Sequence, residues 1–231
     1  MKRFIIILFV LFCCFSTANT QSSTDNEKLA NIDEQSLNKI KTFWEYASKN
    51  ESKLLSGNNS EAVAYFDELF KLLKLINENL GFYIFEEKNN KIDLIISSGG
   101  NSVYFELCDT IVKMSPKLVK LNPISLMPSL EKVEPFTIGN MVFSVDDVRV
   151  HFDNDDDDID LMFILNEYHL SMIRNDNSEQ FYSVYLQILN IMTLQLLGER
   201  VAGNRIKDGF IAPLSTIMPS IPFIEMKKYI K

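Results

Sequence analysis

The chain has 231 residues and a formal net charge of −8, with 46% hydrophobic and 23% charged residues. This is the composition of an ordinary globular protein with room for one sizeable core. The excess of acidic residues argues against binding to a nucleic-acid backbone, because that binding needs clustered Lys and Arg. Two of the three cysteines lie in the N-terminal apolar run, which excludes a disulfide framework and a cysteine-based zinc site.

The N-terminus has the layout of a secretory signal peptide. Two basic residues precede an apolar segment, residues 4–15, and small residues follow it. We therefore predict a signal peptide over residues 1–20, cleaved after Ala18 or after Thr20, and an exported protein that is periplasmic or secreted. Two alternatives stay open, an uncleaved N-terminal membrane anchor and lipidation of a cysteine in the apolar segment.

The next part of the chain is predicted to be a leader and two helices. Residues 21–35 are polar and lack periodicity, which indicates a flexible leader to a single α+β domain over residues 36–231. Apolar residues at helical spacing then mark two N-terminal helices. Their predicted buried stripes are Leu37, Ile40, Trp44 and Ala47 in the first, and Val63, Phe66, Phe70 and Leu73 in the second.

The order strand, strand, helix, strand then occurs twice. The first copy covers residues 82–86, 92–97, 103–114 and 121–127, and the second covers residues 147–152, 159–166, 181–197 and 205–214. Each helix is expected to return the chain parallel to the preceding strand, by a right-handed crossover. The third strand of the first copy contains Pro123 and is followed by Pro128, which favours an edge or bulged position.

The most apolar part of the second copy is predicted to be core. Residues 161–165 form an unbroken apolar run, which suits a strand covered on both faces. Residues 181–197 contain no charged residue, so a helix there must be buried against a sheet or another helix. We therefore predict an α+β fold, with a mixed β-sheet built from two β-β-α-β units, two N-terminal helices and a short C-terminal helix at residues 223–230.

Several short motifs resemble those of an uncharacterised bacterial α+β domain family. They are Phe43-Trp44 followed by Lys49-Asn50-Glu51, Leu94-Ile95-Ile96-Ser97 with Gly100-Asn101, Ser115-Pro116-Lys117-Leu118, and Leu197-Gly198-Glu199. The resemblance covers roughly residues 40–215 and implies a bacterial source. It implies no catalytic residue, because no activity is established for the family. The chain departs from the pattern at residues 200–203, which intervene where an acidic or polar residue usually follows the Gly-Glu pair.

An acidic turn between two strands contains the candidate metal ligands Asp153, Asp155 and Asp157. Alternating carboxylates can bind a hard cation such as Ca²⁺. The EF-hand pattern fails, because Asp158 stands where the loop needs Gly and Ile164 stands where it needs Glu. We favour a solvated hairpin turn, whose charge also discourages edge-to-edge aggregation, and keep a weak Ca²⁺ site as the alternative.

The other reactive side chains favour structural roles. His151 and His169 belong to no metal-binding helix motif, so we interpret both as ordinary surface or strand histidines. Cys108 is predicted to be a buried, inert thiol on the inner face of its helix, together with Val103, Leu107 and Ile111. Residues 97–102 are interpreted as a strand-to-helix turn capped by Asn or Ser, with an anion site as the alternative.

Glu199 follows Gly198 at the end of the long helix and has several possible roles. It is either a functional carboxylate or a structural group that caps the turn or pairs with Arg205. We favour the structural roles.

No complete catalytic motif is present, so we expect no catalytic residue and no cofactor. The favoured interpretation is a non-catalytic binding or interaction module with an unknown protein partner, and its acidic surface favours a basic partner by electrostatic steering. One alternative is a hydrolase of unrecognised mechanism that uses carboxylate and His residues, and another is the weak Ca²⁺ binder. We expect no nucleic-acid partner, and membrane contact only through the N-terminal segment if it is not cleaved.

Overall fold

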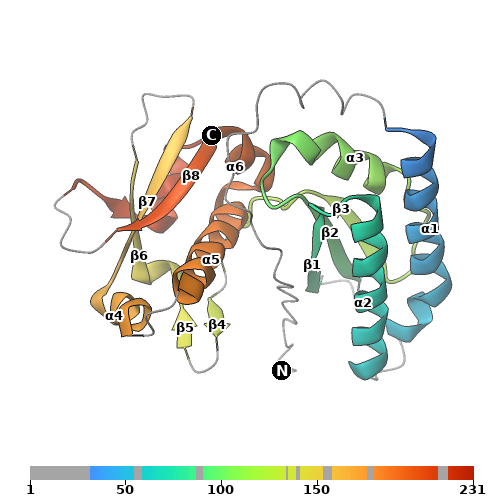
Figure 1. Cartoon of the computed structure of the whole chain (residues 1–231), viewed down its shortest axis with the longest axis horizontal. Coiled ribbons are helices and arrows are strands. Elements are labelled where there is room, and N and C mark those ends of the chain that lie inside the picture. The colour runs from blue at the N-terminus through green and yellow to red at the C-terminus, as the bar shows by residue number, and fades with distance from the viewer. Residues whose placement is uncertain are drawn as a thin grey trace. The chain divides into compact units, whose positions relative to one another are not determined.

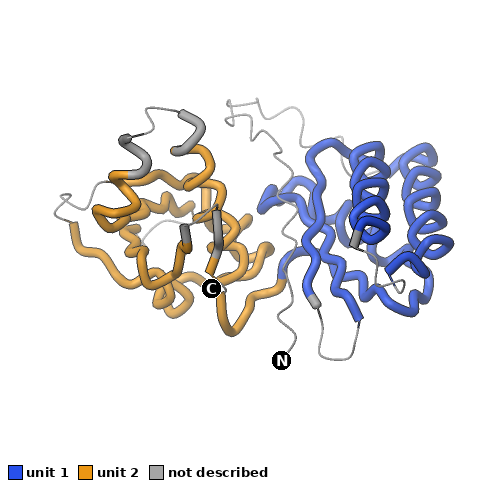
Figure 2. Tube along the Cα trace, turned by 90° about the horizontal axis from the view of Figure 1, so that it is seen from below, with its two compact units in different colours: residues 1–127 blue, residues 128–231 orange. Residues whose placement is uncertain are grey.

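The computed structural model describes residues 32–54, 59–86, 91–133, 135–138, 141–152, 158–175, 179–212 and 218–231. The predicted signal peptide, most of the leader and the turn with Asp153, Asp155 and Asp157 lie outside these ranges. The chain divides into two compact units, residues 1–127 and residues 128–231 (Figure 2). The expectation of one domain over residues 36–231 stays a prediction. Within the described ranges, no helix combines the length and hydrophobicity needed to cross a membrane.

In the part of unit 1 that the structure describes, three α-helices share one core with a three-stranded sheet (Figure 1). Strand β2 pairs antiparallel with β1 and parallel with β3, which is an edge strand as predicted. The first β-β-α-β unit is therefore confirmed. The elements of unit 1 are α1 (Glu34–Asn50), η1 (Glu51–Leu54), α2 (Asn59–Ile76), β1 (Gly81–Glu86), β2 (Ile92–Ser97), η2 (Ser102–Tyr104), α3 (Phe105–Lys113) and β3 (Leu121–Ser125).

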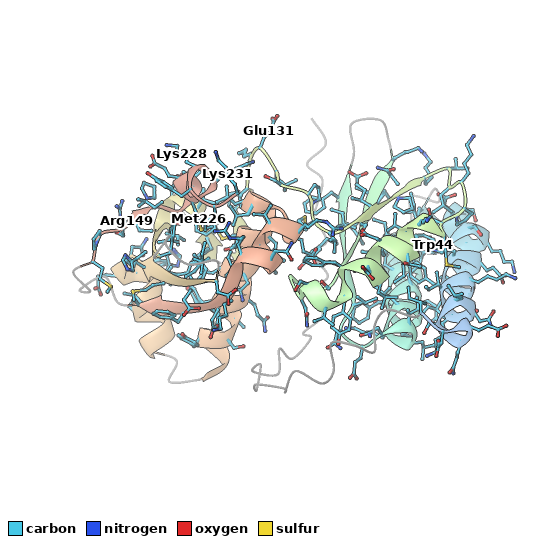
Figure 3. All side chains as sticks on the ribbon, turned by 90° about the horizontal axis from the view of Figure 1, so that it is seen from above. Trp44, Glu131, Arg149, Met226, Lys228 and Lys231 are labelled. Atoms are coloured by element: carbon cyan, nitrogen blue, oxygen red, sulfur yellow. The ribbon has the colours of Figure 1, made fainter. Side chains whose placement is uncertain are left out.

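The core of unit 1 lies between the helices and one face of the sheet, which contributes Phe82, Leu94 and Ile96. Trp44 points from α1 toward α3, where its Nε1 donates a hydrogen bond of 2.7 Å to the Ile111 carbonyl (Figure 3). This bond satisfies the one polar atom of a buried indole and fixes α1 against α3.

Two predicted core positions in unit 1 are wrong. Leu37 is exposed, because the buried stripe of α1 begins one turn later, at Ile40. Val103 is exposed because residues 102–104 form a 3₁₀ turn, so that α3 begins only at Phe105, which is buried instead.

Unit 2 repeats the same strand order in a sheet of its own. Strand β7 pairs antiparallel with β6 and parallel with β8, and the sheet order is β8-β7-β6-β9. The second β-β-α-β unit is therefore also confirmed. The elements of unit 2 are β4 (Phe136–Ile138), β5 (Met141–Phe143), η3 (Val145–Asp147), β6 (Val148–His151), β7 (Ile159–Leu165), α4 (Glu167–Asn175), α5 (Glu179–Leu197), α6 (Glu199–Arg205), β8 (Ile206–Ala212), β9 (Ile221–Pro222) and η4 (Phe223–Lys228).

Helix α5 is the central helix of unit 2, as its apolar sequence predicts. All its residues from position 191 to position 197 are buried. Gly209 on β8 makes room for this packing, because an added Cβ there would lie 2.9 Å from the Phe163 ring and 3.5 Å from Asn190 Oδ1 of α5. The predicted short C-terminal helix is the 3₁₀ helix η4, whose Phe223 and Met226 are buried. The hairpin β4–β5, the helices α4 and α6 and the strand β9 were not predicted.

Candidate functional site

Residues 113–120, which we call the lysine loop, join α3 to β3 in unit 1 (Figure 1). The loop contains Lys113, Lys117 and Lys120, and no acidic residue stands between positions 109 and 131 of this acidic chain. Val119 has 72% of its surface exposed and Met114 has 38%, which are high values for large apolar side chains. The loop therefore presents apolar and positively charged groups together.

The backbone of the lysine loop is held by a buried carboxylate. Glu51 begins η1 directly after α1, and only 8% of its surface is exposed. Its carboxylate accepts hydrogen bonds from the backbone N–H of Val119 at 3.0 Å and of Leu121 at 2.8 Å, and also from the N–H of Lys120. Hydrogen bonds to an ionised acceptor are among the strongest in proteins, so they fix the loop backbone while Val119 stays in solvent.

Two further contacts bring other lysines to this end of unit 1. The Lys120 carbonyl accepts a hydrogen bond of 2.8 Å from the N–H of Ile92, so Lys91 lies beside the loop. Lys53 follows Glu51 within η1, and its Nζ lies 5.7 Å from the centre of the Tyr46 ring. The three lysines of the loop therefore lie close to Lys91, while Glu51, whose carboxylate contacts the loop, is buried beneath the loop backbone.

Unit 2 contains a buried cluster of a histidine, a carboxylate and a phenol. His169 of α4 is only 2% exposed, and its Nε2 lies 3.6 Å from Asp147 Oδ2 while its Nδ1 lies 3.3 Å from the Tyr185 hydroxyl. Asn166 donates a hydrogen bond of 3.1 Å to Asp147 Oδ1, and the Phe143 ring packs edge-on against the imidazole at 4.6 Å. The prediction of a surface or strand position for His169 is wrong, because this helical side chain faces the interior.

The geometry of this cluster suits an interior contact better than proton transfer. The 3.6 Å separation of His169 Nε2 and Asp147 Oδ2 exceeds hydrogen-bond distance, and that same oxygen accepts a hydrogen bond of 3.0 Å from the backbone N–H of Ser144. Tyr185 is buried, and burial raises the pKa of its phenol, with the neighbouring Tyr168 adding to the effect. The cluster therefore joins η3, α4 and α5 through contacts in the interior of unit 2.

The other histidine and the cysteine have structural surroundings. His151 Nδ1 lies 2.6 Å from the Pro219 carbonyl and so connects β6 to the segment before β9. Cys108 is a free, buried thiol on α3, as predicted. Asn101 caps the predicted strand-to-helix turn, because its side chain accepts a hydrogen bond of 3.1 Å from the N–H of Val103.

The Leu197-Gly198-Glu199 motif lies at the end of α5. Gly198 has a φ of +85°, and a Cβ there would lie 3.0 Å from the Ser129 backbone nitrogen. Ser129 Oγ donates to the Leu196 carbonyl at 2.8 Å, so the segment before β4 satisfies a free carbonyl of the helix end. Glu199 is fully buried at the start of α6. Position 198 therefore requires glycine, because its φ is positive and because the backbone of Ser129 approaches it closely.

The predicted metal ligands Asp153, Asp155 and Asp157 lie outside the described residues, so a Ca²⁺ site there stays a prediction. Asp158 and Asp160, which flank that turn, are exposed. Among the residues that the structure describes, no group of three or more metal-binding side chains gathers.

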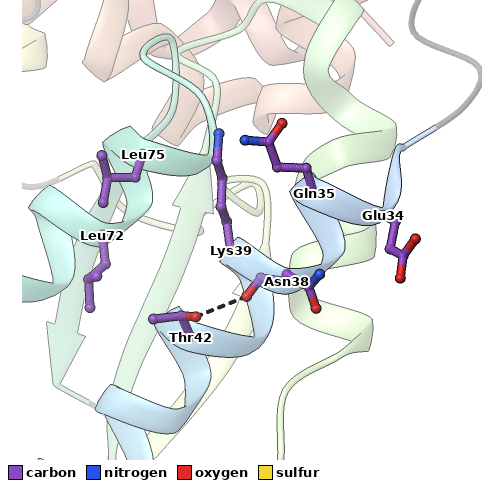
Figure 4. Close-up of a pocket in the computed structure, with 7 residues that line it drawn as sticks. All are labelled: Glu34, Gln35, Asn38, Lys39, Thr42, Leu72 and Leu75. Atoms are coloured by element: carbon purple, nitrogen blue, oxygen red, sulfur yellow. Dashed lines mark hydrogen bonds between the residues drawn. The ribbon is translucent and has the colours of Figure 1, made fainter.

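A hollow of about 500 Å³ lies between α1 and α2 in unit 1 (Figure 4). Polar and apolar side chains both line it. Leu75 is largely exposed there, and Thr42 donates a hydrogen bond of 3.0 Å to the Asn38 carbonyl within α1. The lining residues are Glu34, Gln35, Asn38, Lys39, Thr42, Leu72 and Leu75. None of the candidate residues predicted from sequence lies in this hollow.

Comparisons of the chain with protein-family models, with curated proteins and with solved structures each found no significant match. The resemblance to a bacterial domain family therefore stays a prediction.

Proposed function

We propose that this chain is a non-catalytic binding module and that the lysine loop is its contact surface. The observation that carries the proposal is the pairing of an exposed Val119 side chain with a backbone held by Glu51. A loop that is ordered before binding loses less conformational entropy when it binds, so its contacts are realised more fully as affinity. The predicted signal peptide puts this contact in the periplasm or outside the cell.

The surroundings of the reactive side chains support binding over catalysis. His169, Tyr185, Glu199 and Cys108 are all buried, and the contacts given above for His169 and Tyr185 are to neighbours within unit 2. A catalytic group must reach a substrate, and these groups would have to be uncovered first.

A hydrolase is the second candidate, because the His169 imidazole lies between a carboxylate and a phenol, with Nε2 3.6 Å from Asp147 Oδ2 and Nδ1 3.3 Å from the Tyr185 hydroxyl. The candidate needs an opening that admits substrate to the imidazole. It predicts that the exported protein hydrolyses simple esters and that His169→Asn abolishes this hydrolysis. We expect no hydrolysis above the buffer rate by either protein.

The binding proposal is tested by photocrosslinking in the cell that makes the protein. A photoreactive amino acid replaces Val119 in one variant and Val142 in the control, since Val142 on β5 is also an exposed apolar residue, at 58%. We expect adducts from position 119 that position 142 does not give. Equal adducts from both positions, or none from position 119, would overturn the proposal.

A further inference from the structure

We infer that the lysine loop docks on an anionic phospholipid surface, with Val119 and Met114 entering the interface and the loop lysines contacting headgroup phosphates. The inference rests on the proposed function, because it names the partner of the same loop. It differs from the membrane contact expected from the sequence, which involved only the N-terminal segment.

Charge is the first argument for this partner. The chain as a whole is acidic, so its mean charge opposes an anionic membrane. Electrostatic attraction at a membrane acts only over about one Debye length, roughly 8–10 Å, so the groups nearest the surface decide its sign. Lys113, Lys117 and Lys120 form no ion pair with any described residue, and Lys91 lies next to them. This end of unit 1 is therefore attracted to anionic lipid.

The residue types of the loop favour lipid over a protein partner. Energetically important protein–protein contacts are enriched in Trp, Tyr and Arg, and protein–protein interfaces as a whole are enriched in Met and depleted in Lys. The lysine loop has no Trp, Tyr or Arg, but it has three lysines, one methionine, one valine and one proline. Long lysine stems can lie along an apolar surface while their ammonium groups stay at the level of the phosphates.

The fixed backbone of the lysine loop keeps the Val119 side chain directed outward, where it can enter the lipid interface. Leu118 is buried in the core of unit 1, while the next side chain, Val119, is directed to solvent. The hydrogen bonds that the Glu51 carboxylate accepts from the loop backbone hold this alternation in place before any contact is made. The loop can therefore insert its apolar side chain without rearranging.

The test measures binding of the exported protein, with its natural N-terminus, to phosphatidylcholine vesicles with and without about one third phosphatidylglycerol. Each lysine near such a surface contributes about five-fold to affinity, so we expect the K113Q/K117Q/K120Q variant to bind about 100-fold more weakly. The matched control K41Q/K71Q/K74Q changes the net charge equally on α1 and α2, and it should bind within about three-fold of wild type. All variants share one N-terminus, so any contribution from residues 1–20 cancels.

A second variant tests the apolar contribution separately. Val119→Gln keeps every charge and alters an exposed side chain, so it should fold normally and bind several-fold more weakly. The inference is overturned if the loop variant and the charge control bind equally, or if phosphatidylglycerol does not strengthen binding. If vesicles are not bound but position 119 still crosslinks to a protein, the lipid inference falls and the proposed function stands. If position 119 gives no adducts either, both fall.

Discussion

The carboxylate of Glu51 accepts a 2.8 Å hydrogen bond from the backbone N–H of Leu121, which lies 70 positions later in the sequence. Val119 and Lys120 donate to the same carboxylate. One side chain at the end of α1 thereby fixes both the start of β3 and the loop that precedes it. The account of this protein as a binding module depends on that relationship.

Glu51→Gln should destabilise the protein by about 2–3 kcal/mol, because the amide removes the charge and turns an N–H₂ donor toward backbone donors. Urea unfolding measures the free energy. Glu45→Gln is the matched control, since this glutamate on α1 has a side chain that is 52% exposed and pairs with Lys49 at 3.8 Å. The control should lose less than about 0.5 kcal/mol. Equal losses would mean that the buried carboxylate has no special role.

Gly198→Ala should destabilise the protein by about 1–3 kcal/mol, because the new Cβ meets the Ser129 backbone and a positive φ strains any other residue. Gly81 provides the comparison, since no atom lies within 4 Å of a Cβ added there. Gly81→Ala should change the free energy of unfolding by less than about 0.5 kcal/mol. Thermal or urea unfolding of both variants checks the difference, and a similar loss at the two sites would contradict it.

Tyr65 should make stability depend on pH in the alkaline range. Burial raises the pKa of its phenol, and the charge of Glu51 and the neighbouring Tyr46 raise it further. The folded-state pKa therefore lies above the unfolded value of about 10, so the stabilisation is complete below pH 10 and is lost as pH rises further.

Tyr65→Phe removes this ionisation along with the hydrogen bond of 3.1 Å to the Ala47 carbonyl. The variant should be about 1 kcal/mol less stable at neutral pH. It should also lose stability less steeply than wild type above pH 10. Urea unfolding at a series of alkaline pH values measures both slopes, and identical slopes would refute the assignment.

His169→Asn should lower stability by about 1–3 kcal/mol, because it removes a buried ring that packs against Phe143 and contacts Tyr185. A double-mutant cycle with Asp147→Asn should give a coupling energy of at least about 0.5 kcal/mol. Crosslinking from position 119 should not change. Loss of that crosslinking in a folded His169 variant would show that the cluster contributes to binding.

Local patterns were sufficient to predict much of the fold. The two β-β-α-β units follow from apolar strands and helices whose periods can be recognised within a few residues, as at residues 92–97 and 181–197. Leu37 and Val103 were misplaced because helix ends and 3₁₀ turns change which side chains face the core. The apolar character of a residue does not show where a helix end or a 3₁₀ turn changes the direction of its side chain.

The candidate site was much harder to predict. Glu51 binds backbone N–H groups, which any residue supplies, so its partners have no signature in the sequence. Neither Val119 nor Met114 was predicted to be exposed, because both side chains are apolar. One signal was present, since three lysines stand between positions 109 and 131 with no acidic residue among them, in a chain of net charge −8.

Hydrogen exchange at the amides of Val119, Lys120 and Leu121 tests the central claim most directly. The amides that Glu51 binds should exchange slowly in the free protein, although Val119 and its flanking lysine side chains lie at the surface. In Glu51→Gln they should exchange at least about ten-fold faster while the β2 amides remain protected. Rapid exchange of these three amides in the wild-type protein would contradict a loop that is ordered in advance for binding.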